Sequence, residues 1–221
     1  MDKVLITGGT GFVGFWMYKT APANFQCWRV DRFIYGLDIL WTQRKFDYII
    51  HLAPITPSIV LRYAKRNNVR LLYASSGIVY HPENNTEYRQ NKIKWEQECL
   101  DSGVDVVIAR LFTFCGERLD EGKAIVQFER AARDGNPLRI WGDGSCVRSY
   151  MHGREMALWL WAILLHGESG QAYDVGSDEP VTMLELAKRY SDNIVIENSR
   201  PDPMPVYLPV DTAKTKALLN L

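Results

Sequence analysis

The fold is decided near the start of the chain by the stretch VLITGGTGFVG, which runs from Val4 to Gly14. Its first three residues are apolar and include two β-branched side chains, a composition typical of a short buried strand. Glycines follow at positions 8, 11 and 14, and the next residues, FWMYK, can continue as a helix. The stretch therefore predicts a strand, a glycine-rich turn and a helix in direct succession.

The glycines at this turn have the spacing that a dinucleotide-binding loop requires. Gly8, Gly11 and Gly14 form the pattern GxxGxxG between a strand and a helix. Glycine lets the backbone approach a pyrophosphate, and the N-terminus of the helix offers N–H groups and partial positive charge to the anion. We therefore expect this turn, including Phe12 and Val13, to bind a dinucleotide cofactor.

A carboxylate lies at the sequence position that is expected to contact the ribose of such a cofactor. Asp31 follows the second strand-like run, CWRV at 27–30, and lies seventeen residues after Gly14. A carboxylate there can accept hydrogen bonds from the two hydroxyls of the adenosine ribose, which favours NAD. Arg32 is next in the sequence and can instead meet a 2′-phosphate, so NADP stays open as an alternative.

Further along, apolar runs alternate with helical patterns. Strand-like runs lie at 48–53, 70–76 and 104–112, and helix candidates lie at 58–67 and 88–102. Strands that are apolar on both faces predict an α/β fold, a Rossmann-like doubly wound parallel sheet. Glycines punctuate the chain after Phe114, which predicts a small C-terminal substrate lobe. We assign 1–115 to an NAD(P)-binding domain and 116–221 mainly to that lobe, with some segments returning to the sheet.

Composition excludes several classes of protein. The 221 residues are 47% hydrophobic and 24% charged, which rules out a disordered chain. Lys and Arg number 26, as do Asp and Glu, so the formal net charge is zero and neither nucleic acid nor a membrane surface is an expected partner. The longest apolar run, 156–165, is too short to span a bilayer, and the N-terminus lacks the pattern of a signal peptide. We expect a cytoplasmic protein.

Cysteine and histidine give no sign of a disulfide framework or a metal site. The four cysteines are widely scattered, with no CxxC pair, and are interpreted as free thiols. His51 and His152 have no second ligand at metal spacing, so no metal is expected.

A second group of chemically active residues follows the fourth strand-like run. Tyr88 and Lys92 stand four residues apart at the start of a predicted helix, and Ser75 and Ser76 end the preceding strand. Residues at i and i+4 share a helix face, so the ammonium can lie beside the phenol and lower the pKa of the tyrosine toward working pH. The tyrosine then serves as a general acid or base, and a serine hydroxyl can bridge to a substrate oxygen.

In order and along nearly its whole length, the chain resembles the extended short-chain dehydrogenase/reductase family, whose members are nucleotide-sugar epimerases, dehydratases and reductases. The segments that carry the resemblance are TGGTGFVG, HLAP, ASSGIVY, YRQNK, ARLFTFCGE, GDGSCVRSYMH and YDVGSDEPVTMLELA. The resemblance implies that Tyr88 is the catalytic acid/base, that Lys92 is its partner and holds the nicotinamide ribose, and that Ser76 is the catalytic hydroxyl, with Ser75 as the second choice. Gly77 and Ile78 stand where related dehydratases carry an Asp-Glu pair, which disfavours dehydration.

The resemblance also implies binding roles and a homodimer. Cofactor contacts are expected from Asp38 and Ile39 and from the strand end that continues through Leu52, Ala53 and Pro54. The sugar nucleotide is expected to contact Thr113 and Arg148, although a salt bridge from Arg148 to Asp143 or Glu155 is an alternative role. Relatives often pair through the helix that bears Tyr88 and Lys92, which would bury Ile93 and Trp95 between two copies.

Three functions remain open at this level. The first is an NAD(P)-dependent enzyme that epimerises a nucleotide sugar or reduces a keto sugar. The chain is shorter than most relatives, so the second is a dinucleotide-binding or regulatory module without catalysis. The third is an interaction subunit whose seven tryptophans serve a partner, although aromatic side chains are more often core residues.

Overall fold

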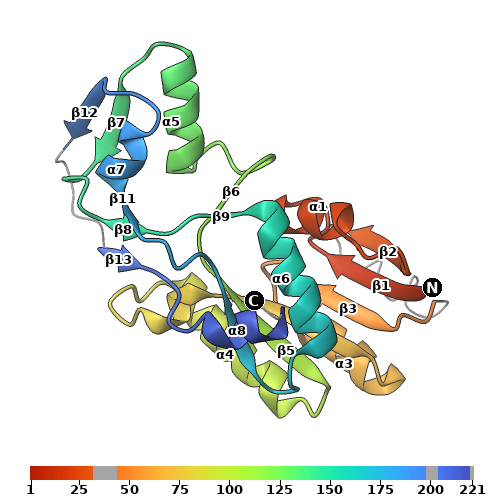
Figure 1. The fold of residues 1–221 in the computed structure, drawn as a ribbon. Helices are drawn as coiled ribbons and strands as arrows, with labels where there is room; N and C mark the ends of the chain where they lie inside the picture. Colours follow the sequence, from red (N-terminus) through yellow and green to blue (C-terminus); the bar gives the residue numbers. More distant parts are fainter. Residues whose placement is uncertain (32–43, 198–203, 220–221) are drawn as a thin grey trace.

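The central element of the protein is a parallel six-stranded sheet (Figure 1). The computed structural model describes residues 1–31, 44–197 and 204–219. The strand order is β10-β5-β4-β3-β1-β2, and every neighbouring pair is parallel. The strands are β1 (Asp2–Thr7), β2 (Phe25–Val30), β3 (Tyr48–His51), β4 (Arg70–Ser76), β5 (Val106–Leu111) and β10 (Ala172–Val175). The predicted Rossmann-like α/β class is confirmed.

Helices cover both faces of this sheet because alternate strand residues point to opposite sides. Val4 and Ile6 of β1 belong to the core on one face, where α1 (Phe12–Lys19) and α6 (Gly153–His166) lie side by side. Leu5 belongs to the core on the other face, beneath α3 (Ser58–Asn67) and α4 (Glu87–Asp101). This two-sided burial explains why the strands are apolar throughout.

Beyond the sheet stands a smaller lobe with its own hydrophobic core (Figure 1). It contains α5 (Ala124–Arg133), α7 (Met183–Lys188) and the parallel pair β7 (Leu138–Trp141) and β12 (Ile194–Glu197). A second small sheet joins β11 (Val181–Thr182), β8 (Val147–Arg148) and β13 (Val206–Tyr207). The pair β6 (Phe114–Cys115) and β9 (Met151–His152) marks the crossing between lobe and sheet. After it, α6, β10 and α8 (Ala213–Leu218) pack in the layers of the central sheet.

The helix boundaries follow from local capping. The helix predicted at 58–67 occupies that range, and the one predicted at 88–102 runs from Glu87 to Asp101. Its start is fixed by Thr86, whose hydroxyl accepts a hydrogen bond from the Arg89 N–H. The last turn of α3 ends in the left-handed conformation at Asn68, at φ 53°. Cys27, Cys99, Cys115 and Cys146, which all lie in the described part of the chain, form no disulfide bonds.

One buried ion pair ties α4 to the sheet. Glu96 is 7% exposed and accepts hydrogen bonds from the Arg110 guanidinium, at 2.6 Å from Nη2 and 3.1 Å from Nε. The Ser75 hydroxyl donates to the same carboxylate at 2.5 Å. Helix α4 is thereby attached through one side chain to both β4 and β5. A buried carboxylate is tolerated here because charge and hydrogen-bond donors surround it.

We predict that Arg110→Met destabilises the protein by about 3 kcal/mol, because it leaves the Glu96 charge buried without its partner. The measurement is urea unfolding followed by circular dichroism. Lys19→Met is the control, since the Lys19–Glu117 pair is exposed and pairs of that kind contribute about 0–1 kcal/mol. Equal, small losses in both variants would contradict the role assigned to the buried pair.

Candidate active site

The glycine-rich turn lies at the carboxyl end of β1, where the strand order passes from β2 on one side to β3 on the other. Such a switch point is where open α/β sheets bind ligands. Gly8 has a φ of +70°, and a Cβ there would lie 2.8 Å from the Ala53 nitrogen. A Cβ on Gly14 would lie 2.5 Å from the Gly9 Cα. Only glycine permits this close packing of turn, helix and neighbouring strand.

Gly11 serves a different purpose in the same turn. It is the N-cap residue of α1, and a Cβ there would meet only the Gly8 carbonyl oxygen within 4 Å, at 3.4 Å. The space in front of the helix N-terminus is therefore open to an anion. Asp31 lies beside the turn, where its Oδ2 accepts a hydrogen bond from the Thr10 N–H at 2.7 Å. The predicted glycine turn and its carboxylate are thus adjacent.

Sequence reasoning assigned no role to Gly9, yet this residue is as constrained as the predicted glycines. A Cβ on Gly9 would lie 2.6 Å from the Arg29 Cβ on β2. The signal was present in the doubled glycine of the segment TGGTG.

A buried histidine, His51, holds the carboxyl end of β3 in place. His51 is 2% exposed, its Nδ1 lies 2.7 Å from the Thr7 hydroxyl, and its Nε2 lies 3.2 Å from the Ile55 carbonyl. A carbonyl can only accept, so Nε2 carries the proton and Nδ1 accepts from Thr7. Burial lowers the pKa of His51 to about 4, so the ring is neutral at physiological pH. It joins β1 to β3 just before Leu52–Pro54, the segment predicted to contact the cofactor.

The three predicted catalytic residues face one cavity. Ser76 ends β4, Tyr88 lies in the first turn of α4, and Lys92 follows one turn later. The Lys92 ammonium donates to the Ala74 carbonyl at 2.7 Å and lies 5.8 Å from the centre of the Tyr88 ring. The lysine is 4% exposed, whereas Tyr88 is 47% exposed. The fold therefore brings all three together, with the tyrosine open to a ligand.

The expected effect of Lys92 on the tyrosine is wrong for this structure. The pKa of Tyr88 is raised, because burial disfavours the phenolate more than a hydrogen bond with Ser76 favours it. Burial also lowers the pKa of Lys92 to about 8. The Lys92 ammonium donates hydrogen bonds to the Ala74 carbonyl and the Tyr73 hydroxyl.

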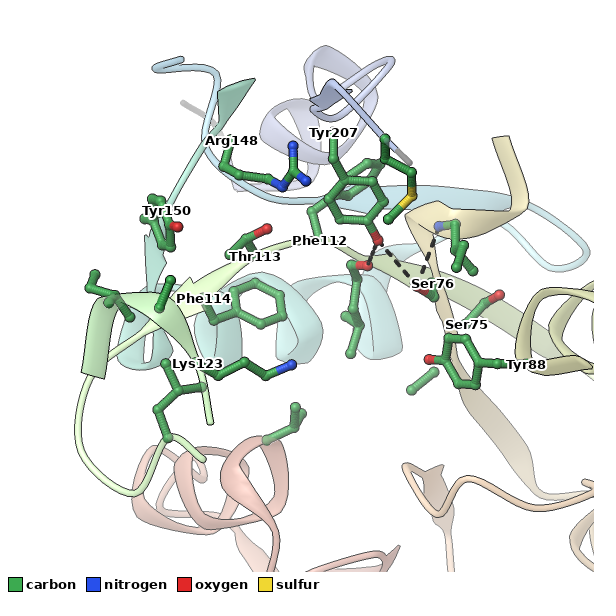
Figure 2. Close-up of a pocket in the computed structure, with 18 of the residues that line it drawn as sticks. Ser75, Ser76, Tyr88, Phe112, Thr113, Phe114, Lys123, Arg148, Tyr150 and Tyr207 are labelled. Carbon is green, nitrogen blue, oxygen red and sulfur yellow. Dashed lines mark hydrogen bonds between the residues drawn. The ribbon is translucent and has the colours of Figure 1, made fainter. Parts of the chain in front are cut away.

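The cavity has a volume of about 590 Å³ and extends from the cofactor side to the C-terminal lobe (Figure 2). Predicted residues that line it are Val13, Leu52, Pro54, Ser75, Ser76, Tyr88, Lys92, Thr113 and Arg148. Phe12 lies outside this lining and stacks on Phe114, with ring centres 6.3 Å apart. Ser75 contacts Glu96, which leaves Ser76 as the serine whose hydroxyl approaches Tyr88.

At the far end of the cavity, Arg148 donates to the Val147 carbonyl at 2.8 Å, and its guanidinium carbon lies 6.0 Å from the centre of the Tyr207 ring. Asp143, one alternative partner, accepts hydrogen bonds from Ser145. Figure 2 shows Lys123 reaching into the same cavity from below. Two cationic side chains therefore stand at this end.

Sequence reasoning missed Lys123, Tyr207 and Glu96. Glu96 had a signal, since it lies four residues after Lys92 on the same face of α4. Lys123 and Tyr207 carried no such sequence signal, because they reach the cavity only when the lobe and the C-terminal segment pack against the sheet. Three predicted cofactor contacts, Arg32, Asp38 and Ile39, lie outside the described residues.

The described part of the chain holds neither a metal-binding cluster nor a helix that could span a membrane. Residues 1–31, 44–197 and 204–219 contain no cluster of three or more His, Cys, Asp or Glu side chains suited to a metal ion. Within the same ranges, no helix is both long and apolar enough to span a bilayer.

The glycine turn, the strand-end carboxylate and the parallel sheet define a Rossmann-like dinucleotide-binding protein. The model of the NAD dependent epimerase/dehydratase family matches residues 4–176, so the chain belongs to that family. This membership agrees with the resemblance seen in the sequence and confirms NAD as the predicted cofactor.

Two curated relatives carry the name UDP-glucuronic acid decarboxylase. UDP-glucuronic acid decarboxylase 2 of Arabidopsis thaliana is 30% identical over an alignment that covers 87% of this chain and 57% of that protein. UDP-glucuronic acid decarboxylase 1 of Danio rerio is 26% identical, over 84% of this chain and 59% of that protein. The chain thus spans less than two thirds of the length of these curated relatives.

Solved structures share the fold. The dTDP-glucose 4,6-dehydratase of Bacillus anthracis, in complex with NAD, has a TM-score of 0.85 at 18% identity, covering 100% of this chain and 91% of that one. The UDP-glucose 4-epimerase of Thermotoga maritima, with UDP-glucose, has a TM-score of 0.82 at 18% identity, covering 97% and 91%. At this identity the likeness shows the fold alone.

We predict opposite outcomes for two alanine substitutions in the turn. Gly14→Ala forces a methyl group against backbone atoms and destabilises the fold by about 1–3 kcal/mol. Gly11→Ala leaves the thermal unfolding midpoint near that of the wild type but weakens NAD binding about tenfold, because the methyl group stands where the pyrophosphate approaches. Circular dichroism and quenching of tryptophan fluorescence by NAD measure the two effects. Wild-type NAD affinity in Gly11→Ala would contradict the placement of the cofactor.

Proposed function

We propose that this chain catalyses hydride exchange between NAD and a hydroxyl-bearing carbon of a nucleotide sugar. The reaction is epimerisation through a keto intermediate or reduction of a keto sugar. The observation that carries this proposal is one cavity lined by Ser76, Tyr88 and Lys92 together with Val13 of α1 and with Leu52 and Pro54, which follow β3. A non-catalytic binding module has no need of an acid/base tyrosine left open to the cavity.

The residues divide the chemistry among them. In the reducing direction, the Tyr88 hydroxyl, which its raised pKa keeps protonated, donates its proton to the carbonyl oxygen of the sugar while the carbon accepts the hydride. In the oxidising direction, the deprotonated Tyr88 oxygen would take that proton back as the hydride leaves the carbon. The Ser76 hydroxyl donates to the same sugar oxygen and stabilises its developing charge. Lys92, anchored on the Ala74 carbonyl, holds its ammonium beside the tyrosine. When bound, NAD supplies the hydride acceptor.

The far end of the cavity suits a diphosphate. Arg148 offers a planar fork of donors and Lys123 a point charge, which together match two phosphate groups. Among the described residues that line the cavity, none is acidic, so nothing there repels an anion. The nucleotide sugar would then lie with its diphosphate in the lobe and its sugar at Ser76.

Packing around Gly77 argues against dehydration. A Cβ at this position would lie 2.3 Å from the Phe112 ring, so no aspartate fits there without displacing the aromatic ring. Ile78 is buried and apolar. The Asp-Glu pair expected of related dehydratases is therefore absent after Ser76, and the packing at position 77 does not accommodate an aspartate.

Decarboxylation of a uronic acid is a second candidate. The proteins that match at 26% and 30% identity carry the name UDP-glucuronic acid decarboxylase. Once a keto group stands β to a carboxylate, the bond to the carboxyl carbon can break, CO₂ leaves, and the electron pair moves to the keto oxygen. That step needs no acidic residue, and Tyr88 and Ser76 would again stabilise the oxygen.

One experiment separates these functions. The protein is incubated with NAD and UDP-glucose, UDP-glucuronic acid or dTDP-glucose, or with NADH and a nucleotide-linked keto sugar, and the products are separated by liquid chromatography and identified by mass spectrometry. An isomer of unchanged mass indicates an epimerase, loss of CO₂ a decarboxylase, and consumption of NADH a reductase. NAD binding without any product would favour the non-catalytic module.

Tyr88→Phe tests the acid/base assignment. We predict that turnover falls by about 10²–10⁴, because the variant has no hydroxyl to exchange a proton with the sugar, while NAD affinity stays near that of the wild type. Steady-state rates and fluorescence titration with NAD provide the measurement. Tyr48→Phe, on a strand outside the cavity lining, is the control. An unchanged rate in Tyr88→Phe would remove this residue from the mechanism.

The exposed face of α4 supports a homodimer. Ile93 and Leu100 are 41% and 44% exposed and lie seven residues apart on one side of the helix. Trp95, expected to be buried between two copies, instead packs partly against the protomer's own core. The proposed interface therefore rests on Ile93 and Leu100.

We predict that the double substitution Ile93→Asp and Leu100→Asp converts a dimer to a monomer, because it places charges in an apolar contact. Light scattering at micromolar concentration is the measurement. Leu158→Asp, at a position on α6 that is 46% exposed, is the control and should stay dimeric. A monomeric wild type would contradict the proposal.

A further inference from the structure

A buried tyrosine of the central sheet contacts the ammonium of Lys92. Tyr73 lies on β4, three residues before Ser76, and is fully buried. Its hydroxyl oxygen accepts a hydrogen bond from the Lys92 Nζ at 3.4 Å, and the centre of its ring lies 5.0 Å from the same nitrogen. The roles described above assign no function to this hydroxyl.

Lys92 has few partners that can stabilise its positive charge. Its ammonium carries three N–H groups, and the residue is 4% exposed. Within the described part of the chain, two atoms accept hydrogen bonds from it, the Ala74 carbonyl oxygen at 2.7 Å and the Tyr73 hydroxyl oxygen. The third N–H is therefore left for a ligand in the cavity that Lys92 lines. Of the two acceptors, only the oxygen of Tyr73 belongs to a side chain.

The titratable groups around Lys92 add little to this support. They are Tyr88, Glu96 and Cys99 on its own helix, and His51 and Tyr73 on the sheet. Burial raises the pKa of Tyr88, raises that of Cys99 to about 12 and lowers that of His51 to about 4, so these three groups are uncharged at neutral pH. Among these described groups, Glu96 is charged, but its carboxylate also accepts hydrogen bonds from Arg110 and Ser75.

The charge of Lys92 is set by the balance between burial and these contacts. Burial lowers its pKa to about 8, against the attraction of Glu96. An acceptor that bonds to the ammonium favours the charged form. Burial also raises the pKa of Tyr73, so its hydroxyl stays neutral and its oxygen remains an acceptor. Without that oxygen, one more N–H of a buried cation would have no partner, and the charged form would be disfavoured.

We propose that Tyr73 is a positioning residue that keeps Lys92 charged and directs its remaining N–H into the cavity. This proposal rests on the role proposed for Lys92 beside Tyr88 and the cofactor. Tyr73 itself does not line the cavity, so it acts through Lys92 and exchanges no proton with a ligand.

The test removes only the hydroxyl, in Tyr73→Phe, and follows the charge of Lys92 directly. The full chain is prepared with ¹³C at Cε of its lysines, and the signal of Lys92 is identified by its absence in Lys92→Arg. The chemical shift of this signal is followed against pH and reports the pKa of the amine. We expect this pKa to fall by about 1 unit in Tyr73→Phe, the equivalent of one hydrogen bond to a charged group.

The affinity for NAD should change with the charge of Lys92. With a pKa of about 8, about three-quarters of the Lys92 side chains are charged at pH 7.5, and a pKa lowered by about 1 unit leaves about one-quarter charged. NAD affinity in Tyr73→Phe should therefore fall about threefold at pH 7.5 and stay near that of the wild type at pH 6. An equal loss at both pH values would contradict the proposal, because a merely structural effect does not follow the charge of Lys92.

Two further variants keep the test decisive. Tyr63→Phe removes another buried hydroxyl of the same core, one that donates to the Arg44 carbonyl, and should leave the pKa of Lys92 unchanged. Tyr73→Leu lacks the same oxygen as Tyr73→Phe and should lower the pKa of Lys92 at least as far. The prediction applies to whichever variant of Tyr73 keeps the near-ultraviolet circular dichroism of the wild type.

The titration decides the proposal without any turnover, because neither NAD nor a sugar is present. An unchanged or raised pKa of Lys92 in Tyr73→Phe would show that the hydroxyl does not stabilise the ammonium and would overturn the proposal. A lowered pKa in a protein that converts no nucleotide sugar would support the role of Tyr73 and count against the proposed function alone. Turnover with an unshifted pKa would overturn this inference and leave the proposed function intact.

Discussion

The buried Glu96 carboxylate is the interaction on which the arrangement of the site depends. It holds α4 against β4 through Ser75 and against β5 through Arg110. The same guanidinium continues to the Tyr80 hydroxyl at 2.6 Å, and that hydroxyl donates to Asp174 at 3.0 Å. Because Asp174 also binds the backbone that follows β13, a continuous chain of polar contacts runs from the helix that carries Tyr88 to the C-terminal segment. In a low-dielectric interior such a network is stable only when every member has its partner.

This network separates two electrostatic regions. Outside the cavity, the carboxylates of Glu96 and Asp174 accept hydrogen bonds from groups within the protein. The polar side chains in the described lining of the cavity are all cationic or hydroxyl-bearing, among them Lys123, Arg148 and Tyr88. Burial acts on two of the lining groups in opposite directions, since it raises the pKa of Tyr88 and lowers that of Lys92. An anionic ligand therefore meets no carboxylate in the described lining of the site.

Local sequence encoded much of the fold and part of the site. The glycine turn, the helix at 58–67 and the tyrosine–lysine pair on α4 were predictable because each depends on neighbouring residues, through turn chemistry or helical periodicity. The sign of the Tyr88 pKa shift was not predictable, because it depends on burial by distant segments. Lys123 and Tyr207 were missed for the same reason, since the lobe and the C-terminal segment bring them to the cavity. The position of Glu96 near Lys92 could have been predicted from their helical spacing alone.

The Phe112 ring packs against two positions near Ser76, Gly77 and Tyr207. Its ring occupies the space that any side chain at Gly77 would need. The centre of the same ring lies 5.1 Å from that of the Tyr207 ring and so helps to place Tyr207 beside Ser76. An aspartate at position 77 would have to displace Phe112 and would disturb the support of Tyr207. The same ring therefore both limits the side chain that position 77 can carry and supports Tyr207 next to Ser76.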